Sequence, residues 1–449
     1  RPTDADADAS AVSWVPQPHG FGTRVDPYAQ RAAHVERLLR SLPQPLDVAL
    51  NDGGDGTMFD ARDCGTFTDV SALRALRDAD ADASKALALD LALCKLQVQR
   101  RLGRGAFASV HLVERLDDDA TDADVLSEST YALKVLDDAA EARWEYYVCK
   151  TLERRVRAAF DAEAAAASGA DDADAARRHR ERQHALAQFG HVRMLEVYDD
   201  AGFIVMDAGV HGTLQDVINV HRLANKKLDE VLVMYFTIEM LRALELLHAH
   251  GIVHADIKPD NWLLRAATTR GAAGAAAAAA APKWDAWSAD VCDARGWPEH
   301  GLQLIDFGSA LDTTLYADGT RFVGKGRAAS GFECIEMCAG EAWCAQLDTF
   351  GVCATVHALL HNAYMDVVRD TATGRHRPKA PFKRYWNGAL WRELFDTLLN
   401  GGNDAAAPDA LAAMRHKFEH YLTANTTKAR AVKPALNRMQ VLLYERGRE

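Results

Sequence analysis

The chain has 449 residues, a formal net charge of −12 and hydrophobic residues at 48% of its positions. This length allows one large two-lobed domain or about three small ones, and the acidic balance argues against a protein that binds nucleic acid through clustered basic charge. Because no apolar run approaches the roughly 20 residues of a membrane span, we expect a soluble, intracellular product without a membrane partner. The eight cysteines include no C-x2-C pair, which favours free thiols over disulfides or a zinc site.

The amino-terminal region is predicted to hold a disordered leader and one helix. Residues 1–24 are rich in Asp, Ala, Pro and Gly, a composition that buries too little apolar surface to fold. Asp26-Pro27 resembles a helix N-cap followed by proline at the first helical position, and the apolar residues after it recur at helical spacing, namely Val35, Leu38, Leu39 and Leu42. We expect Pro43 to end this helix. The loop 51–56 lacks the ligand spacing and the distal Glu of a calcium loop, so we interpret it as turns.

Short strands begin at Lys95, and the first pair encloses a glycine-rich turn. The order strand, glycine turn, strand predicts a hairpin. Small residues at Gly103, Gly105 and Ala108 would let backbone N–H groups approach phosphate oxygens. An ordinary hairpin explains the pattern equally well, because Ala108 replaces the third glycine of G-x-G-x-x-G. The residues of this segment that we expect to contact a nucleotide are Leu102, Gly103, Arg104, Gly105, Ala106, Phe107, Ala108 and Val110.

A strand that carries a lysine follows the hairpin. Residues 131–135, Tyr-Ala-Leu-Lys-Val, match V-A-I-K, a strand motif whose lysine pairs with the α- and β-phosphates of ATP. Lysines on strands are usually solvated, but Lys134 follows a glycine hairpin at the expected distance. Glu145 on the next predicted helix is the carboxylate that we expect to pair with Lys134, and Glu141 and Glu153 remain alternatives.

An insertion, two strands and a hinge are predicted next. Residues 158–188 pass from an Ala/Asp stretch to an Arg/His stretch and are interpreted as an insertion, helical or mobile. Two apolar strands follow within 192–206. The end of the second has the composition of a hinge between lobes, and the residues expected to contact adenine there and on the lysine strand are Ala132, Met206, Asp207 and Gly209. A long amphipathic helix is predicted from about Asp229 to His250.

The stretch 252–264 carries the most specific motif of the chain. His254-Ala-Asp-Ile-Lys-Pro-Asp-Asn261 has the order of the protein-kinase catalytic loop H-R-D-x-x-x-x-N. In that template Asp256 accepts the proton of the attacking hydroxyl and Asn261 helps to hold Mg²⁺. Lys258 is expected to lie against the transferring phosphoryl group, and His254 has a structural role. The alternative is a charged surface turn between a helix and a strand.

A second acidic motif and a hydroxyl-rich segment follow. Residues 266–300, Ala-rich and then Trp-bearing, are interpreted as a low-complexity insertion. Asp306 begins D-F-G after a predicted strand, and in the kinase template this Asp chelates Mg²⁺ between the β- and γ-phosphates. The activation segment is expected to include Ser330 and to end at Glu336, which has the position of the A-P-E glutamate. Asp348 is expected to be buried and to bind the backbone of the catalytic loop.

These motifs together predict an α+β fold, the bilobal protein-kinase fold. We expect a small antiparallel-sheet N-lobe at 95–207 and a larger, mainly helical C-lobe at 208–449, preceded by an extension at 25–94 that packs on the kinase. The predicted reaction is transfer of the γ-phosphoryl group of ATP, with Mg²⁺, to a protein hydroxyl. A lysine two residues after the catalytic Asp is the usual serine/threonine-kinase arrangement, so tyrosine specificity is disfavoured.

Six segments together resemble one family, the Bub (budding uninhibited by benzimidazole) kinases of the mitotic spindle assembly checkpoint. They are 103–108, Trp144-Glu145, 212–214, 254–261, 330–336 and 348–351. The resemblance implies a nuclear serine/threonine kinase at kinetochores, with a core histone as one substrate and checkpoint and kinetochore proteins as partners. Two features depart from the family: Phe307 stands where members often carry Leu, and the two Ala-rich insertions are not expected.

Two competing hypotheses and one regulatory expectation remain. A pseudokinase scaffold is the first alternative, although Lys134, Asp256, Asn261 and Asp306 are all present. A small-molecule kinase is the second, but it would not need a segment that docks polypeptide. Ala255 replaces the Arg that in many kinases holds a phosphorylated loop residue, so we expect basal activity without an upstream kinase.

Overall fold

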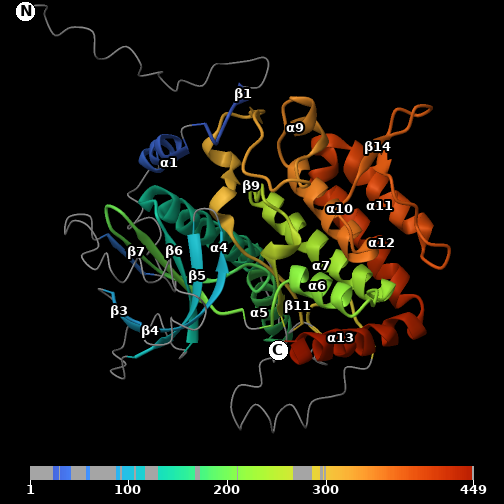
Figure 1. Cartoon of the computed structure of the whole chain (residues 1–449), viewed down its shortest axis with the longest axis horizontal. Helices are drawn as coiled ribbons and strands as arrows, with labels where there is room; N and C mark the ends of the chain where they lie inside the picture. The colour runs from blue at the N-terminus through green and yellow to red at the C-terminus, as the bar shows by residue number, and fades with distance from the viewer. Residues whose placement is uncertain are drawn as a thin grey trace, which may run out of the picture.

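The computed structural model shows a sheet-bearing lobe and a larger helical lobe side by side (Figure 1). It describes residues 24–29, 31–41, the backbone of 57–60, 87–91, 94–105, 108–116, 130–166, 172–209, 211–265, 286–293, 297 and 300–446. The expectations for the leader, the loop 51–56, Ala106 and Phe107 lie outside these ranges. No helix within them is both long enough and apolar enough to cross a bilayer.

The smaller lobe is built on a seven-stranded sheet in the part of the chain that the structure describes. Its order is β2-β7-β8-β6-β5-β4-β3, and its neighbours pair antiparallel except for β2 and β7, which run parallel. The strands are β2 (Thr57–Asp60), β3 (Ala88–Asp90), β4 (Lys95–Arg104), β5 (Ala108–Arg115), β6 (Thr130–Leu136), β7 (Val192–Val197) and β8 (Gly202–Asp207).

Strand β6 has one face in a small apolar core and the other face toward helix α4 and the C-lobe. Side chains alternate across a strand, so Tyr131, Leu133 and Val135 enter an apolar cluster with residues of β4, β7 and β8. Ala132 and Lys134 therefore belong to the opposite face, where helix α4 (Ala139–Ala166) and the C-lobe lie. Because side chains alternate along β6, Lys134 lies on the face opposite the small core.

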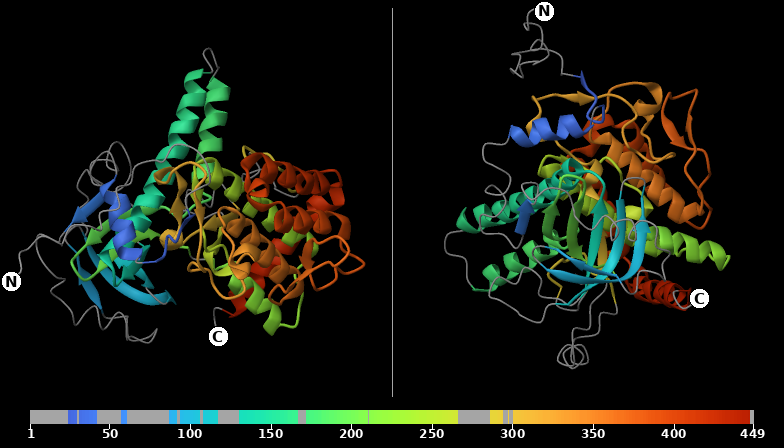
Figure 2. Two further views of the ribbon diagram at one scale, coloured as in Figure 1. Left: turned by 90° about the horizontal axis from the view of Figure 1, so that it is seen from above. Right: turned by 60° about the vertical axis from the view of Figure 1, so that its left-hand side comes forward.

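Helix α4 continues well beyond the lobe that it covers. With α5 (Asp172–Leu186) it forms a helical pair that projects from the body of the molecule (Figure 2, left). The residues of the projecting part are rich in alanine and arginine, which are strong helix formers. The described residues of the 158–188 segment are thus helical apart from a short turn before β7.

The larger lobe is helical, with short strands at its cleft. Its helices are α6 (Leu214–Leu223), α7 (Glu230–Ala249), α9 (Ile335–Ala339), α10 (Gln346–His361), α11 (Gly388–Asn400), α12 (Pro408–Thr423) and α13 (Thr426–Arg446). The strands are β9 (Ile252–Val253), β10 (Trp262–Arg265), β11 (Gly301–Leu304), β12 (Leu311–Asp312), β13 (Arg321–Phe322), β14 (Val367–Arg369) and β15 (His376–Pro378). Helix α10 is buried along nearly its whole length and packs against α7 and α11.

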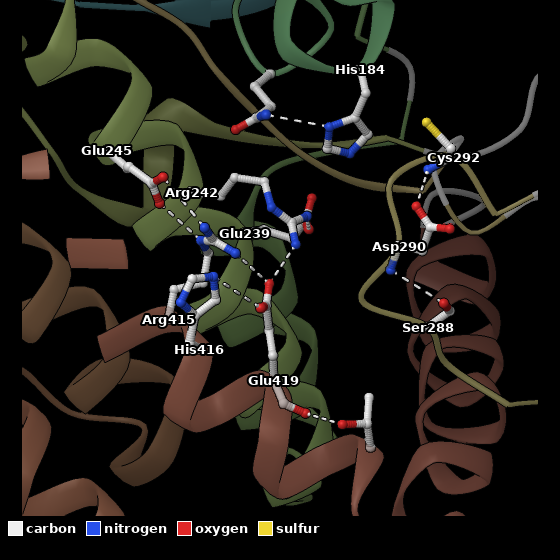
Figure 3. Close-up of polar contacts among 12 residues, drawn as sticks. His184, Glu239, Arg242, Glu245, Ser288, Asp290, Cys292, Arg415, His416 and Glu419 are labelled. Atoms are coloured by element: carbon white, nitrogen blue, oxygen red, sulfur yellow. Dashed lines mark hydrogen bonds and ion pairs between the residues drawn. The ribbon is translucent and has the colours of Figure 1, made fainter. Parts of the chain in front are cut away.

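A network of charged side chains joins α7 to α12 (Figure 3). Arg242 donates to Glu239 at 2.9 Å and to Glu419 at 2.7 Å. Arg415 binds the same Glu419 at 2.7 Å and Glu245 at 2.9 Å. We call this set the α7–α12 network; its members are Glu239, Arg242, Glu245, Arg265, Arg415 and Glu419.

The described part of the 266–300 segment docks on the C-lobe. Trp287 and Trp297 pack edge-on against Tyr235 of α7, with ring centroids 6.3 and 6.1 Å apart. Asp290 forms an ion pair with Arg177 of α5 at 3.3 Å. This segment therefore contacts both the C-lobe and the projecting helical pair.

The amino-terminal helix begins later than its sequence suggests. Helix α1 spans Arg31–Arg40, whereas the Asp26-Pro27 pair predicted a start at Pro27. Asp26 instead accepts hydrogen bonds from the N–H groups of Tyr28 and Ala29 at 3.0 and 3.1 Å, which closes a turn. The predicted helix start was therefore wrong, because Asp stabilises such side-chain-capped turns as readily as helix N-termini. Just before it, β1 (Arg24–Val25) pairs in parallel with β13.

Candidate active site

Lys134 lies at the centre of a buried ion cluster between the lobes. Its Nζ is 2.8 and 2.6 Å from the two carboxylate oxygens of Glu145 and 2.7 Å from Oδ1 of Asp306. The alternatives for the partner of Lys134 have other contacts: Glu141 binds Arg327 at 2.7 Å, and Glu153 binds Arg157 at 2.7 Å. The structure thus pairs Lys134 with Glu145, as expected from the sequence.

The protonation states of this cluster follow from its charges. Burial acts to lower the pKa of Lys134, but the carboxylates of Asp306 and Glu145 outweigh it and raise that pKa. Lys134, opposed by burial, lowers the pKa of Asp306 to about 2. Burial raises the pKa of Glu145, and Lys134 counteracts it. Lys134 and Asp306 are therefore charged at neutral pH.

The catalytic-loop residues form a second set next to this cluster. Lys258 donates to Oδ2 of Asp256 at 2.6 Å, and the amide of Asn261 donates to the carbonyl and to Oδ2 of Asp256 at 2.8 and 3.1 Å. Oδ1 of Asp256 is buried and has no hydrogen-bond partner among the described residues. Burial raises the pKa of Asp256, with Lys258 counteracting it. A buried carboxylate oxygen left free in this way is suited to accept the proton of a substrate hydroxyl.

Backbone contacts bring the two sets together. The N–H of Ile305 donates to the carbonyl of Asn261 at 3.0 Å, and Nε2 of His254 lies 3.0 Å from the carbonyl oxygen of Ile305. The ring of His254 also packs edge-on against Phe307 at 4.9 Å. His254 therefore links the catalytic loop to D-F-G, which accounts for its structural role.

Asp348 holds the backbone of the catalytic loop. Its carboxylate, fully buried near the start of α10, accepts hydrogen bonds from the N–H of His254 at 2.8 Å and of Ala255 at 2.7 Å. It also lies 3.0 Å from Nε2 of His248. The sequence placed Asp348 in this structural role, and its contacts agree with that expectation.

Two non-glycine residues adopt a left-handed backbone conformation at this site. Ala255 has φ of +63° and Asp306 has φ of +67°. Such conformations are costly for residues with a Cβ and occur where the surroundings enforce them. Here the hydrogen bonds of Asp348 hold Ala255, and the ion pair with Lys134 holds Asp306. The two strained residues therefore lie in the catalytic loop and in D-F-G, the two acidic motifs predicted from the sequence.

The residues expected around the nucleotide lie on the strands next to Lys134 or just after them. Ala132 pairs with Met206 across β6 and β8. Gly209 packs against the side chain of Leu263 of β10, which would have to move if a Cβ were added. Asp207 is held by Arg193 at 2.8 Å. The remaining described residues of the set lie on β4, β5 or the turn between them: Leu102, Gly103, Arg104, Gly105, Ala108 and Val110.

Glycines of the β4–β5 turn leave free space above the cleft. A Cβ at Gly103 would meet no heavy atom within 4 Å, and one at Gly105 would meet only the carbonyl oxygen of Ala108 at 3.7 Å. Nothing within the described chain therefore requires glycine at Gly103. Its absent side chain leaves room for a ligand, in agreement with the interpretation as a phosphate-covering turn.

The activation segment, residues 306–336, runs from D-F-G to α9. Ser330 is exposed, and Glu336 lies in the first turn of α9, where its negative charge suits the positive end of the helix dipole. Phe332 packs edge-on against Tyr364 at 6.3 Å. Ser330 and Glu336 thus lie on the activation segment rather than in the ion cluster of Lys134.

Sequence reasoning missed the contacts of the amino-terminal extension. Tyr28 donates its hydroxyl hydrogen to the carbonyl of Ser309 at 2.6 Å, and Arg31 donates to the carbonyl of Gly308 at 3.1 Å. Arg31 also lies 3.6 Å from a carboxylate oxygen of Glu141. These residues hold the backbone at the end of D-F-G. The only sequence signal was the conspicuous pair of Tyr28 and Arg31 beside a predicted helix start.

Ion pairs between α4 and the activation segment were also missed. Arg155 makes two hydrogen bonds to the carboxylate of Asp312, at 3.0 and 2.8 Å, and Tyr147 donates to the same carboxylate at 2.9 Å. Arg327 binds Glu141 through two bonds of 3.1 and 2.7 Å. Unmodified side chains therefore hold α4 against the activation segment.

The donor set of the cleft suits a hard divalent cation bound together with a nucleotide. Asn261 uses its amide nitrogen toward Asp256, which leaves its amide oxygen available, and Asp306 supplies a carboxylate that is 42% exposed. Oxygen ligands of this kind suit Mg²⁺, which commonly takes one or two protein ligands plus substrate phosphates. Asn261 and Asp306 are accordingly the residues that could hold it.

Comparison with known proteins agrees with this geometry. A model of the protein kinase domain matches residues 170–365. The chain is 36% identical over 261 residues to the mitotic checkpoint serine/threonine-protein kinase BUB1 of Arabidopsis thaliana, which covers 57% of this chain and 47% of that protein. It is 29% identical over 333 residues to the spindle assembly checkpoint serine/threonine-protein kinase BUB1 of Saccharomyces cerevisiae. This alignment covers 72% of this chain and 28% of that protein. The chain therefore spans less than half the length of these relatives.

A solved structure shares the fold. The crystal structure of the BubR1 kinase domain matches with a TM-score of 0.65 at 24% identity, over 93% of this chain and 100% of that chain. With the match to the kinase-domain model, this confirms the predicted bilobal α+β fold. The division into an extension, two lobes and two insertions stays a prediction in its exact boundaries.

Proposed function

We propose that the chain is a Bub-type serine/threonine protein kinase that acts in spindle assembly checkpoint signalling at kinetochores, which its similarity to the BUB1 kinases and to the kinase-domain model supports. As a protein kinase domain it uses ATP and a divalent metal, and we propose Mg²⁺ as that metal. One observation carries the enzymatic part of the proposal. Lys134, Glu145 and Asp306 meet within 2.8 Å beside the catalytic loop, in the arrangement that phosphoryl transfer needs.

The chemistry assigned to each residue follows from its contacts. Lys134, held by Glu145, neutralises and orients the α- and β-phosphates, and the glycine turn covers them. Asp256 accepts the proton of the attacking hydroxyl through its free Oδ1, while Lys258 stabilises charge on the transferring group. A Mg²⁺ ion held by Asn261 and Asp306 would supply neutralisation of the phosphate oxygens. The protein thus contributes positioning and charge.

A core histone is the substrate that we propose, with checkpoint and kinetochore proteins as partners and the nucleus as the location. The support is the similarity to kinases named for the mitotic and the spindle assembly checkpoint. We also propose basal activity without an upstream kinase. The pairs Arg155–Asp312 and Arg327–Glu141 already hold the activation segment against α4 without a phosphate group.

One assay tests the proposed function. The purified chain is incubated with labelled ATP, with and without Mg²⁺, and with nucleosomes, after phosphatase treatment. We expect label on histone Ser or Thr, and none with Asp256→Asn. Mg²⁺-dependent ATP binding without transfer would favour the pseudokinase scaffold, and label on an aminoglycoside or choline instead of histone would favour a small-molecule kinase. Protein that is inert until its loop is phosphorylated would contradict basal activity.

A further inference from the structure

A cluster of basic and aromatic side chains lies where α10 ends on the flank of the C-lobe. His357 and His361, one helical turn apart, stack with their ring centroids 4.4 Å apart. The ring of His361 meets Trp386 edge-on at 5.2 Å, and Nζ of Lys383 lies 4.7 Å from the centre of the Trp386 ring. Lys227, from the loop between α6 and α7, reaches Lys383 directly. We call this set the Lys227–Lys383 cluster.

The positive charge of this cluster has no counter-ion in the described part of the chain. Nζ of Lys383 is buried without a hydrogen-bond partner, and so are Nε2 of His357 and Nε2 of His361. The carboxylate of Asp366, on the loop between α10 and β14, lies 3.9 Å from a different lysine, Lys379. A shielded ammonium group without an anionic partner is costly to a fold, so this cluster is incomplete as it stands.

The ionisation of the neighbouring groups reflects these contacts. Contact with Lys383 lowers the pKa of Lys227. Burial opposes the charge of Lys383, but its contacts with Lys227 and Tyr385 raise its pKa. Burial first, and then His357 and the two lysines, lower the pKa of His361 to about 4, so this imidazole is neutral at pH 7. The lysines therefore supply the positive charge, and the histidines supply neutral ring nitrogens around it.

The missing component must be an anion. A water molecule could make hydrogen bonds to the free nitrogens, but it would leave the two ammonium groups facing each other. A phosphate monoester carries close to two negative charges at pH 7 and three acceptor oxygens, and lysine binds phosphate well as a point charge. Its charge would match that of Lys227 and Lys383 together.

We propose that the Lys227–Lys383 cluster binds a phosphate monoester, presented as phosphoserine or phosphothreonine by a polypeptide that docks on the C-lobe. Two tyrosines are 73% exposed: Tyr385, on the loop that carries Lys383, and Tyr364, on the loop between α10 and β14. Tyr364 contacts Phe332 of the activation segment. Exposed aromatic side chains are enriched at protein interfaces, so one bound segment could span the cluster and the activation segment. The link to catalysis rests on the proposed kinase function, but phosphate binding does not.

The binding test uses the full chain without ATP, at constant ionic strength because salt screens such contacts. The probes are inorganic phosphate and two peptides that differ only in serine or phosphoserine. Calorimetry is expected to give at least tenfold tighter binding of the phosphorylated peptide. The variant Lys227→Met/Lys383→Met is expected to lose at least tenfold in affinity for both phosphate probes. The control Lys379→Met, on the same loop and 69% exposed, should bind as the wild type does.

A second measurement separates binding from a structural role. In phosphate-free buffer Lys227→Met, a change at an exposed side chain, should raise Tm because it removes a facing positive charge. Added phosphate should raise the Tm of the wild type but not of this variant. Equal phosphate responses in wild type and variant would overturn the site, and phosphate binding without preference for the phosphopeptide would overturn its polypeptide ligand. The kinase-inactive Asp306→Ala chain should still bind phosphate, so failure of the proposed function would be recognised separately.

Discussion

Two groups of buried charge in this molecule are built differently. The α7–α12 network sets three arginines against three glutamates, and each glutamate lies within 4 Å of an arginine. Figure 3 shows Arg242 and Arg415 with the three glutamates. The cleft sets two lysines, Lys134 and Lys258, against the three carboxylates of Glu145, Asp256 and Asp306. The network is thus neutral by formal charge, whereas the cleft carries an excess of one negative charge.

This difference separates a structural cluster from a functional one. A balanced network needs no further charge, so we interpret it as fixing helices to each other. The cleft has one carboxylate in excess. Both clusters contain a buried carboxylate oxygen without a hydrogen-bond partner among the described residues, Oε2 of Glu239 and Oδ1 of Asp256. A divalent cation held by Asp306 and Asn261 would offset this excess. Burial alone does not distinguish the two clusters, but charge balance does.

The sharpest way to test this contrast is to remove a charge from the cleft. We expect Asp306→Ala to lower histone phosphorylation by about 10²–10³, or roughly 3–4 kcal/mol of transition-state stabilisation. The fold should persist, as judged by circular dichroism, because this side chain is 42% exposed. Asp396→Ala, which breaks a surface pair with Arg375, is the control and should retain full activity. Near-normal turnover of Asp306→Ala would refute the metal role.

Removing a charge from the α7–α12 network should lower the stability of the fold but not its turnover. Arg242→Met leaves Glu239 and Glu419 buried with fewer partners, so we expect a loss of about 3 kcal/mol in the free energy of unfolding by urea. Turnover per folded molecule should stay unchanged. The exposed pair Arg438–Asp229 offers the control Arg438→Met, which should cost less than about 1 kcal/mol. A slower but equally stable Arg242→Met enzyme would contradict the assigned structural role.

The extension should have an intermediate effect on the cleft. Arg31→Ala removes the hydrogen bond to the carbonyl of Gly308 and the contact with Glu141. We expect kcat to fall about tenfold, which corresponds to about 1.4 kcal/mol, because D-F-G loses one of its supports. Arg37→Ala, an exposed change on the same helix, is the control. Equal activity of both variants would show that the extension is not needed to position D-F-G.

The smallest expected effect is on the pH dependence of stability. Lys134, opposed by burial, lowers the pKa of Asp306 to about 2 in the folded state, whereas an unfolded Asp titrates near about 3.9. The stability from this charge is therefore present above about pH 4 and is lost as the pH falls toward 2. Because the side chain is 42% exposed, solvent screening leaves about 1 kcal/mol.

Urea unfolding of wild type and Asp306→Asn at pH 6 and pH 3 measures that contribution. The wild type should be the more stable at pH 6, and the difference should narrow at pH 3. A difference that is independent of pH would mean that the ion pair with Lys134 contributes nothing to stability.

The sequence predicted the elements of the cleft that depend on local pattern. Alternation along β6 turns Lys134 to the cleft face, and the spacing within 254–261 brings Asp256, Lys258 and Asn261 onto one loop. These relations extend over a few residues, so they can be seen in the sequence. Helical spacing likewise offered Glu145 as the partner of Lys134, although it could not exclude Glu141 or Glu153.

Contacts between distant segments were not predictable in the same way. Tyr28 and Ser309 are 281 residues apart, and no periodicity links them. The same holds for Arg327 and Glu141, whose charges have many possible partners in a chain with 52 basic and 64 acidic residues. The turn at Asp26 shows a different limit. The Asp-Pro pair can begin a helix or close a turn through the Asp side chain, and the sequence does not distinguish the two.

Helix α4 has a mechanical consequence. It is one helix of 28 residues, about 42 Å long at 1.5 Å per residue, and Glu145 lies near one end while the other end projects beyond the body of the molecule. Because the helix is continuous, tilting its projecting end would also move Glu145, whose carboxylate holds Lys134. We therefore expect a partner bound at the projecting end to change the rate of phosphoryl transfer.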